Sequence, residues 1–250
     1  MNRNWLKSFT ILALLTVGCK EEKVTPETIV ETVDPYKPLD LLTSSTYTKL
    51  SVEIAYSETN PPATLTVDNI TQFLKDRLNK PDGVTVTLHK LPPTDSATMK
   101  LSGVRRLEEL QREGATSANT LAVWIVFLDT EYAGNPENDR LMGIAYGATS
   151  MVVFAKSIDF YVKADMPARS TLETFVLKHE FGHMFGLVNN GTSMVTNHLS
   201  EDHENHCSNP ECLMYFKAED NIKLNDLVGE DVLPVFDEDC LADLKAAGGK

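Results

Sequence analysis

Apolar and polar residues along the chain follow two different periods, and the first of these indicates strands. Alternation over residues 50–56 and again over 84–88 predicts two strands that each bury one face. Residues 121–128 form an unbroken apolar run, which is typical of a strand buried on both faces in the middle of a sheet. A further apolar segment at 150–155 predicts a fourth strand.

The second period places apolar residues three or four positions apart and predicts helices. Short helices are expected over residues 70–78 and 104–110. A longer one should begin near Thr171, because Ser170 and Glu173 have the spacing of a capping box. The elements follow one another without an internal repeat. They predict one domain of the α+β class over residues 41–250, with a mixed, twisted sheet and a long final helix.

Composition narrows the class of protein. The 250 residues are 42% hydrophobic and 24% charged, which fits a soluble globular domain and excludes a polytopic membrane protein or a disordered chain. Asp and Glu number 36 against 23 Lys and Arg, a formal charge of -13. This excess of acid argues against nucleic acid as a partner and against a polybasic mode of membrane binding.

The N-terminus has the pattern of an export signal. Residues 1–18 combine Arg3 and Lys7 with an apolar run too short to span a bilayer. A small residue directly before Cys19 resembles the lipobox of bacterial lipoproteins, which implies cleavage before that cysteine and its lipidation. Residues 19–40 are rich in Thr, Glu and Pro and predict a tether. We therefore expect a protein of the bacterial cell envelope, attached to the outer membrane only through lipid. The sequence does not indicate which face of the membrane, including the cell surface, the domain occupies.

The predicted long helix carries the residues that indicate catalysis. His179 and His183 are four positions apart and so lie on one face of a helix, where both can bind one metal ion. Glu180 is placed beside that ion, where it can act as general base toward water that the ion activates. Zinc suits this chemistry, so the pattern predicts one catalytic Zn²⁺ and the hydrolysis of peptide bonds.

The third metal ligand must come from another segment. Gly186 can break the helix three residues after His183, and three more histidines follow closely: His198, His203 and His206. A loop imposes no fixed spacing, so each of the three is a candidate. Glutamate is a further alternative, as in thermolysin-like enzymes, but no helical period surrounds the available residues, which are Glu201, Glu204 and Glu211.

The motif around this helix resembles the signature of the metzincin metallopeptidases, in which two histidines, a glycine and a third histidine follow a fixed spacing. The chain matches it as far as Gly186, but Asn189 stands where the third histidine is expected. Downstream, the segment from His206 to Met214 resembles the His-Cys-x4-Cys-x-Met block of the archaemetzincins. That resemblance implies that His206 is the third ligand and that Met214 forms the methionine turn under the metal. It also implies, more weakly, that Tyr215 assists catalysis.

Three cysteines remain beyond Cys19, namely Cys207, Cys212 and Cys240. Archaemetzincins use later cysteines to bind a second zinc, but this chain has only Cys240 after Met214. In an exported protein one disulfide among the three is therefore favoured over a second zinc site, without a preferred pairing.

Residues 73–81, 127–134, 186–194 and 207–214 also resemble segments of a group of predicted lipoprotein metallopeptidases of Bacteroidetes, and the resemblance extends from about residue 50 to the end of the chain. The resemblances together imply an exported, lipid-anchored zinc endopeptidase acting on peptides or proteins. In metzincins an edge strand before the zinc helix pairs with the substrate, and residues 150–155 are the candidate here, with 143–147 at the rim of the cleft. The alternative is a zinc-containing surface lipoprotein that binds a partner and cleaves nothing. Oligomeric state is not indicated.

Overall fold

A computed structural model describes residues 35–93, 95–135, 140–162, 168–216 and 234–250. The predicted signal peptide, Cys19 and most of the predicted tether lie outside these residues. The described residues all belong to the compact unit Asp34–Lys250.

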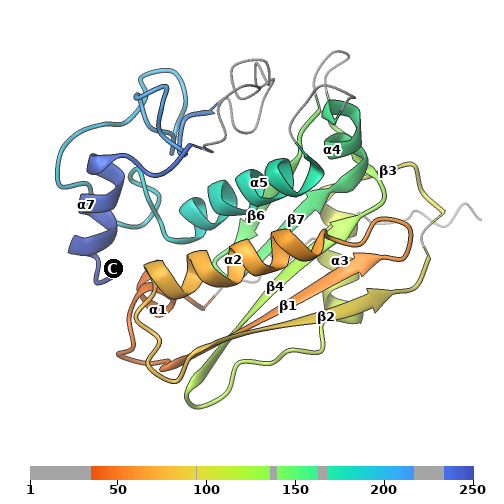
Figure 1. The fold of residues 1–250 in the computed structure, drawn as a ribbon, viewed down its shortest axis with the longest axis horizontal. Coiled ribbons are helices and arrows are strands. Elements are labelled where there is room, and N and C mark those ends of the chain that lie inside the picture. Colours follow the sequence, from red (N-terminus) through yellow and green to blue (C-terminus); the bar gives the residue numbers. More distant parts are fainter. Residues whose placement is uncertain (1–34, 94, 136–139, 163–167, 217–233) are drawn as a thin grey trace, which may run out of the picture. The chain divides into compact units, whose positions relative to one another are not determined.

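Five strands form the main sheet of this unit, in the order β2-β1-β4-β7-β6 (Figure 1). Neighbouring strands are parallel except for β6, which runs antiparallel to β7. The predicted mixed sheet is thus confirmed, and each of the four predicted strands is present. The strands are β1 (Lys49–Ser57), β2 (Val84–Leu91), β4 (Thr120–Leu128), β6 (Gly143–Gly147) and β7 (Ser150–Phe154).

Helices cover both faces of the sheet, and a second sheet of two short strands lies beside it. Among the helices in the described part of the chain, none combines the length and the apolar character needed to cross a membrane. The remaining elements are α1 (Pro38–Leu42), α2 (Thr64–Arg77), β3 (Thr98–Met99), α3 (Leu101–Gln111), β5 (Glu131–Tyr132), α4 (Ala155–Tyr161), α5 (Arg169–Met184) and α7 (Glu238–Ala246).

Strand β4 divides the core into two parts. Its residues alternate between a large cluster under α2 and α5, which includes Val123 and Ile125, and a smaller cluster next to α3, which includes Trp124 and Val126. All of these side chains are buried. The unbroken apolar run of β4 is therefore explained by burial on both faces, as the sequence predicts.

The edge of the sheet differs from the expectation. Residues 150–155 were expected to form the edge strand, but β7 lies between β4 and β6 and is buried throughout. The strand at the edge is β6, over the segment 143–147 that was expected only to rim the cleft. The apolar character of β7 agrees with its interior position, because an edge strand exposes one side to solvent.

The start of α5 also differs from the predicted capping box. The N-cap residue is Ala168, and no side chain caps the helix. Glu173 does not make the backbone hydrogen bond of a capping box. Its carboxylate is fully buried and accepts hydrogen bonds from Thr66 Oγ1 (2.6 Å), Ala63 N (3.0 Å) and the side chain of Arg169 (2.7 Å). This residue thus joins the beginnings of α2 and α5, which a local sequence pattern cannot reveal.

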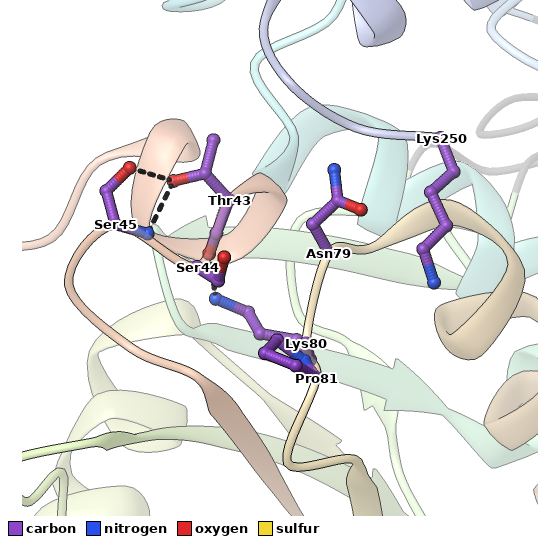
Figure 2. A pocket seen from close by; sticks show the side chains of 7 residues that line it. All are labelled: Thr43, Ser44, Ser45, Asn79, Lys80, Pro81 and Lys250. Atoms are coloured by element: carbon purple, nitrogen blue, oxygen red, sulfur yellow. Dashed lines mark hydrogen bonds between the residues drawn. The ribbon is translucent and has the colours of Figure 1, made fainter.

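Lys80 fastens α1 and the segment after it to the rest of the domain. Its side chain is 7% exposed, and its ammonium group donates to the carbonyl oxygens of Asp40 (2.7 Å), Thr43 and Tyr47 (2.7 Å). Burial lowers the pKa of Lys80 to about 8. A pocket of about 350 Å³ lies here (Figure 2). Because all three ammonium hydrogens go to carbonyls, Lys80 serves as a structural clamp and not as a cation for a ligand.

Replacing Lys80 should destabilise the domain without affecting its chemistry. Lys80→Met leaves three carbonyl oxygens without their donor, so the free energy of unfolding should fall by about 2–4 kcal/mol. Urea denaturation measures the change. The control is Lys250→Met, whose ammonium donates to one exposed carbonyl, that of Lys75, and which should change stability by less than about 0.5 kcal/mol. Equal losses of unfolding free energy in the two variants would contradict the structural role of Lys80.

Candidate metal centre

Helix α5 places two imidazoles on one side, as the four-residue spacing predicts. The rings of His179 and His183 have centroids 4.7 Å apart, and their Nε2 atoms are 3.0 Å apart. Both nitrogens therefore point into the same small volume. His179 is fully buried, whereas His183 is partly accessible.

A third imidazole reaches this volume from the loop after α5. The ring of His206 has its centroid 5.4 Å from that of His179 and 4.9 Å from that of His183. One nitrogen from each ring lies within 4.8 Å of the other two. We call His179, His183 and His206 the histidine centre.

Backbone carbonyls fix the orientation of two of these rings. Nδ1 of His179 is 2.7 Å from the carbonyl oxygen of Leu213, and Nδ1 of His206 is 2.8 Å from that of Glu204. A carbonyl can only accept, so Nδ1 carries the proton in each ring and Nε2 presents its lone pair to the centre. Metal-binding histidines are oriented by such hydrogen bonds in the same way.

The donor set fits zinc. Three zinc–nitrogen bonds of about 2.0–2.1 Å in tetrahedral directions would place neighbouring nitrogens roughly 3.3 Å apart. The measured 3.0 Å between the Nε2 atoms of His179 and His183 is close to this spacing. Three imidazoles with one position left for water or substrate are typical of a catalytic zinc site, whereas structural sites use four protein ligands.

Glu180 lies beside the histidine centre and is held by strand β6. Its side chain is 2% exposed, and Oε2 accepts a hydrogen bond of 2.6 Å from the backbone N–H of Ala145. Gly143 makes room for this arrangement, since a Cβ there would lie 2.7 Å from Cγ1 of Val176 and 3.0 Å from Oε1 of Glu180. The edge strand therefore sets the position of the carboxylate.

Met214 packs against α5 at Gly182. It is fully buried, and a Cβ added to Gly182 would lie only 2.2 Å from its sulfur atom. The helix thus packs directly on the turn that contains Met214, the position that the metzincin resemblance implies. Beyond α5 the chain turns at Gly186, whose φ of 73° is in the left-handed region that glycine adopts without strain.

The other candidate ligands lie elsewhere. His198 belongs to a different cluster, and His203 stacks on Phe216 with ring centroids 3.5 Å apart. Tyr215 is half-buried and forms a tilted ring pair with Phe216, with centroids 4.6 Å apart. The remaining positions considered for the third ligand have exposed side chains that lie outside the histidine centre, namely Asn189, Glu201, Glu204 and Glu211.

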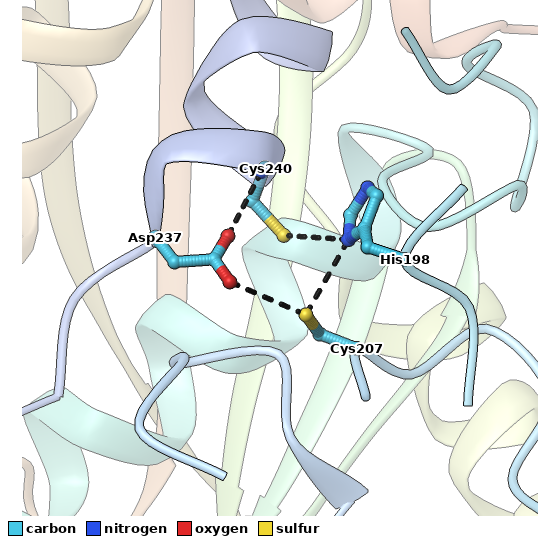
Figure 3. Close-up of side chains that lie close together, drawn as sticks. All are labelled: His198, Cys207, Asp237 and Cys240. Atoms are coloured by element: carbon cyan, nitrogen blue, oxygen red, sulfur yellow. Dashed lines mark hydrogen bonds between the residues drawn. The ribbon is translucent and has the colours of Figure 1, made fainter. Parts of the chain in front are cut away.

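The three cysteines lie together, but they do not form the predicted disulfide. Cys207, Cys212 and Cys240 carry free, buried thiols, and the sulfur atoms of Cys212 and Cys240 are 3.6 Å apart. His198 completes the group, with Nδ1 3.3 Å from the sulfur of Cys207 and 3.9 Å from that of Cys240 (Figure 3). The potential metal ligands that lie within reach of one another here are His198, Cys207, Asp237 and Cys240, and Cys212 is not among them. We call His198, Cys207, Cys212 and Cys240 the thiol centre.

Charged neighbours surround the thiol centre. The Asp237 carboxylate begins α7 by accepting from the N–H of Cys240 (2.9 Å), and it also accepts from the Cys207 thiol (3.4 Å). Asp243, fully buried, lies 2.8 Å from Nε2 of His198. Although burial lowers the pKa of His198, its hydrogen bonds to Asp243 and Cys207 raise the pKa above the usual range. Hydrogen bonds from the other two thiols lower the pKa of Cys207.

A third group of potential ligands has a structural explanation. Glu53 on β1 pairs with His89 on β2 at 2.7 Å, and the exposed Glu113 lies 3.7 Å from the same ring. The Glu53 carboxylate also accepts from the N–H groups of Glu113 (3.1 Å) and Gly114 (2.6 Å). Its hydrogen-bonding capacity is therefore used to fasten the chain after α3 to the sheet.

Several contributors to the two centres are invisible in the sequence motifs. The Leu213 carbonyl and the Ala145 N–H act through backbone atoms, which no residue type signals. Asp243 belongs to no recognisable sequence motif. It contacts His198 because α7 places the two side chains 2.8 Å apart. Asp237 does leave a signal, because Asp three residues before Cys240 has the spacing of a helix N-cap.

Comparison with known proteins supports the fold. The structure is similar to the crystal structure of archaemetzincin from Methanopyrus kandleri, with a TM-score of 0.51 and 20% sequence identity. The similarity covers 81% of this chain and 96% of that chain. No protein family and no curated protein matches the sequence. The described residues therefore have an archaemetzincin-like fold with a twisted, mostly parallel sheet.

The histidine centre makes a direct prediction about metal binding. His206→Ala should lower zinc affinity at this centre more than about 100-fold, beyond the 10–100-fold typical of losing a group that only orients a ligand. Chelator competition on the purified protein measures the affinity. His203→Ala is the matched control, since this residue lies in the same loop but outside the centre, and it should leave the affinity unchanged. The reverse order of effects would assign the third position to His203.

Proposed function

We propose that this protein is an exported, lipid-anchored zinc endopeptidase. The single observation that carries the proposal is the convergence of three imidazoles beside a buried glutamate, next to the edge strand β6 of the sheet that the described residues form. The archaemetzincin-like fold agrees with a zinc metallopeptidase.

His179, His183 and His206 would hold the ion through Nε2. Zinc bound there would polarise a substrate carbonyl and lower the pKa of water at its open position. His179 contributes rigidity because its ring is fully buried and bonded to the Leu213 carbonyl. His183, which is less buried, lies toward the accessible side of the centre.

Glu180 is the candidate general base. Its carboxylate would accept a proton from the attacking water and deliver it to the nitrogen of the departing amine. The Ala145 N–H, 2.6 Å from Oε2, holds the carboxylate in one orientation. This hydrogen bond fixes one carboxylate oxygen relative to strand β6.

Strand β6 is the candidate site for the substrate backbone. It is the outermost strand next to β7, so an extended peptide can extend the sheet by pairing with it. Since Ala145 on this strand also contacts Glu180, a peptide bound there would lie directly beside the general base. Peptides or proteins are therefore the proposed substrates, and lipid at Cys19 is the proposed attachment to the outer membrane.

Removal of the carboxylate tests the role of Glu180. Glu180→Gln should leave zinc content unchanged and lower the cleavage of casein or a peptide library by about 10²–10⁴-fold, the usual contribution of acid–base catalysis. The matched control is Glu204→Gln, which changes an exposed carboxylate in the His206 loop and should retain full activity. Activity that survives Glu180→Gln would rule out this mechanism. Zinc binding without cleavage of any peptide would instead favour a binding module.

Gly143 offers a second test of the same geometry. Gly143→Ala should push the Glu180 carboxylate away from its position, because the added methyl group would collide with Val176 and Glu180. A displacement near 1 Å can cost about 100-fold in rate. We expect kcat to fall by about that factor while zinc content and KM change little. Gly103→Ala is the control, because Gly103 lies on α3 outside the positive-φ region and an added methyl group there would meet only the flexible side chain of Met99. An unchanged kcat would contradict this role of β6.

A further inference from the structure

Two neighbouring residues of the edge strand β6 face opposite sides of the sheet. Ala145 packs against the large core cluster under α2 and α5, whereas Tyr146 belongs to the smaller cluster next to α3. Side chains on a strand alternate in this way. Helix α3 lies on the face of the sheet opposite α5 (Figure 1). A contact that Tyr146 makes with α3 is therefore one residue away from the N–H that holds Glu180.

Strand β6 is irregular at this point. Ala145 lies opposite Met151 of β7 and Gly147 lies opposite Ser150, so Tyr146 is an extra residue on β6. A β-bulge of this kind interrupts the ladder, bends the strand and is common next to active sites. Because the extra residue stands outside the regular pairing, contacts from another element can fix the backbone here.

Arg105 and Glu108 of α3 supply such contacts to both the backbone and the side chain of Tyr146. Arg105 Nη2 donates to the Tyr146 carbonyl oxygen (2.7 Å), and the guanidinium lies over the phenol ring, 5.2 Å from its centroid. The phenol hydroxyl donates to Glu108 Oε2 (2.7 Å). Burial and the Glu108 carboxylate raise the pKa of Tyr146 well above its usual range, so the hydroxyl remains a donor.

Glu108 is itself held by the sheet. Its other oxygen, Oε1, accepts from Arg112 Nη1 (2.7 Å) and from Ser150 Oγ (2.7 Å). Arg112 also donates to the Ala122 carbonyl oxygen on β4 (2.7 Å), which ties this end of α3 to the middle of the sheet. Only 15% of the Glu108 side chain and 20% of the Arg112 side chain are exposed. Short, charge-assisted hydrogen bonds of this kind leave the Glu108 carboxylate little freedom to move.

We propose that two residues of α3, Arg105 and Glu108, position the Glu180 carboxylate from the opposite face of the sheet. They act through Tyr146 and the backbone of β6, because the preceding residue, Ala145, carries the N–H that donates to Glu180 Oε2. Neither α3 residue belongs to the histidine centre, so both are positioning residues. The inference rests on the proposed function in giving Glu180 a catalytic role.

Tyr146→Phe tests the link, because it removes the hydroxyl and keeps the ring. In the metal-free protein, the Ala145 N–H should resonate at low field, as amide protons in short bonds to carboxylates do. Isotopic labelling of the alanine nitrogens and comparison with Glu180→Gln identify this signal, and Tyr146→Phe should move it upfield. In the metal-loaded protein, Tyr146→Phe should lower kcat by about 10-fold and change KM by less than about twofold, since a displacement near 1 Å can cost about 100-fold.

Ser150→Ala is the matched control. It removes the other hydroxyl that donates to Glu108, at the same distance of 2.7 Å, but from β7 instead of β6. The two variants should lose similar unfolding free energy in urea, whereas only Tyr146→Phe should move the Ala145 signal and lower kcat. Equal movements of the signal in the two variants, or none in Tyr146→Phe, would overturn the inference.

Two neighbouring arginines of α3 give a second matched pair. Arg105→Met leaves the Tyr146 carbonyl without its donor, so it should shift the Ala145 signal and lower kcat in the same direction as Tyr146→Phe. Arg106→Met removes only an ion pair with Glu109 in which both side chains are exposed, and it should change neither quantity. The opposite order of effects would show that α3 does not act through β6.

A double-mutant cycle tests the route. In the Glu108→Ala background, Tyr146→Phe should no longer move the Ala145 signal, because residues that act through one contact are not additive. Additive movements would contradict a route through Glu108. The outcomes also separate this inference from the proposed function. If the unaltered protein cleaves no peptide, the peptidase is overturned, while the signal in the metal-free protein still decides the positioning. Cleavage without any response of the signal to Tyr146→Phe would support the peptidase and overturn the positioning.

Discussion

The hydrogen bond from His179 Nδ1 to the Leu213 carbonyl is the contact on which the candidate site depends. It joins a helix to a turn 34 residues further along the chain, and it lies in a fully buried environment. A buried donor without its acceptor would cost about 1–3 kcal/mol. The turn is thus required both for the stability of the helix packing and for the orientation of the first imidazole. Met214, packed on Gly182, maintains the same contact through van der Waals forces.

Much of the fold was predictable because its elements have strong local patterns. The unbroken apolar run of β4 gave its central position, and alternation gave β1 and β2. The edge of the sheet was not predictable in this way, since a short strand such as β6, which starts and ends with glycine, carries little periodicity. The capping box also failed, because burial of Glu173 against α2 outweighed the local alternative.

The site was predictable to the extent that residue type and spacing determine geometry. His179 and His183 follow from helical periodicity, and the loop histidines could be named only as alternatives. The structure groups His206 with them, which a sequence cannot reveal because a loop has no fixed geometry. The cysteines were interpreted as a disulfide because cysteine count was the only available guide. Their arrangement around His198 depends on α7, which returns to the site from the end of the chain.

Leu199 and Cys207 form a short antiparallel pair, which also limits how the loop after α5 can vary in length. A shift of one residue would send an imidazole where a sulfur atom belongs, and a sulfur atom where an imidazole belongs. Insertions or deletions should therefore be tolerated in the exposed residues 189–191, but not between residues 198 and 214. In related chains, that segment should be constant in length even where its exposed side chains differ.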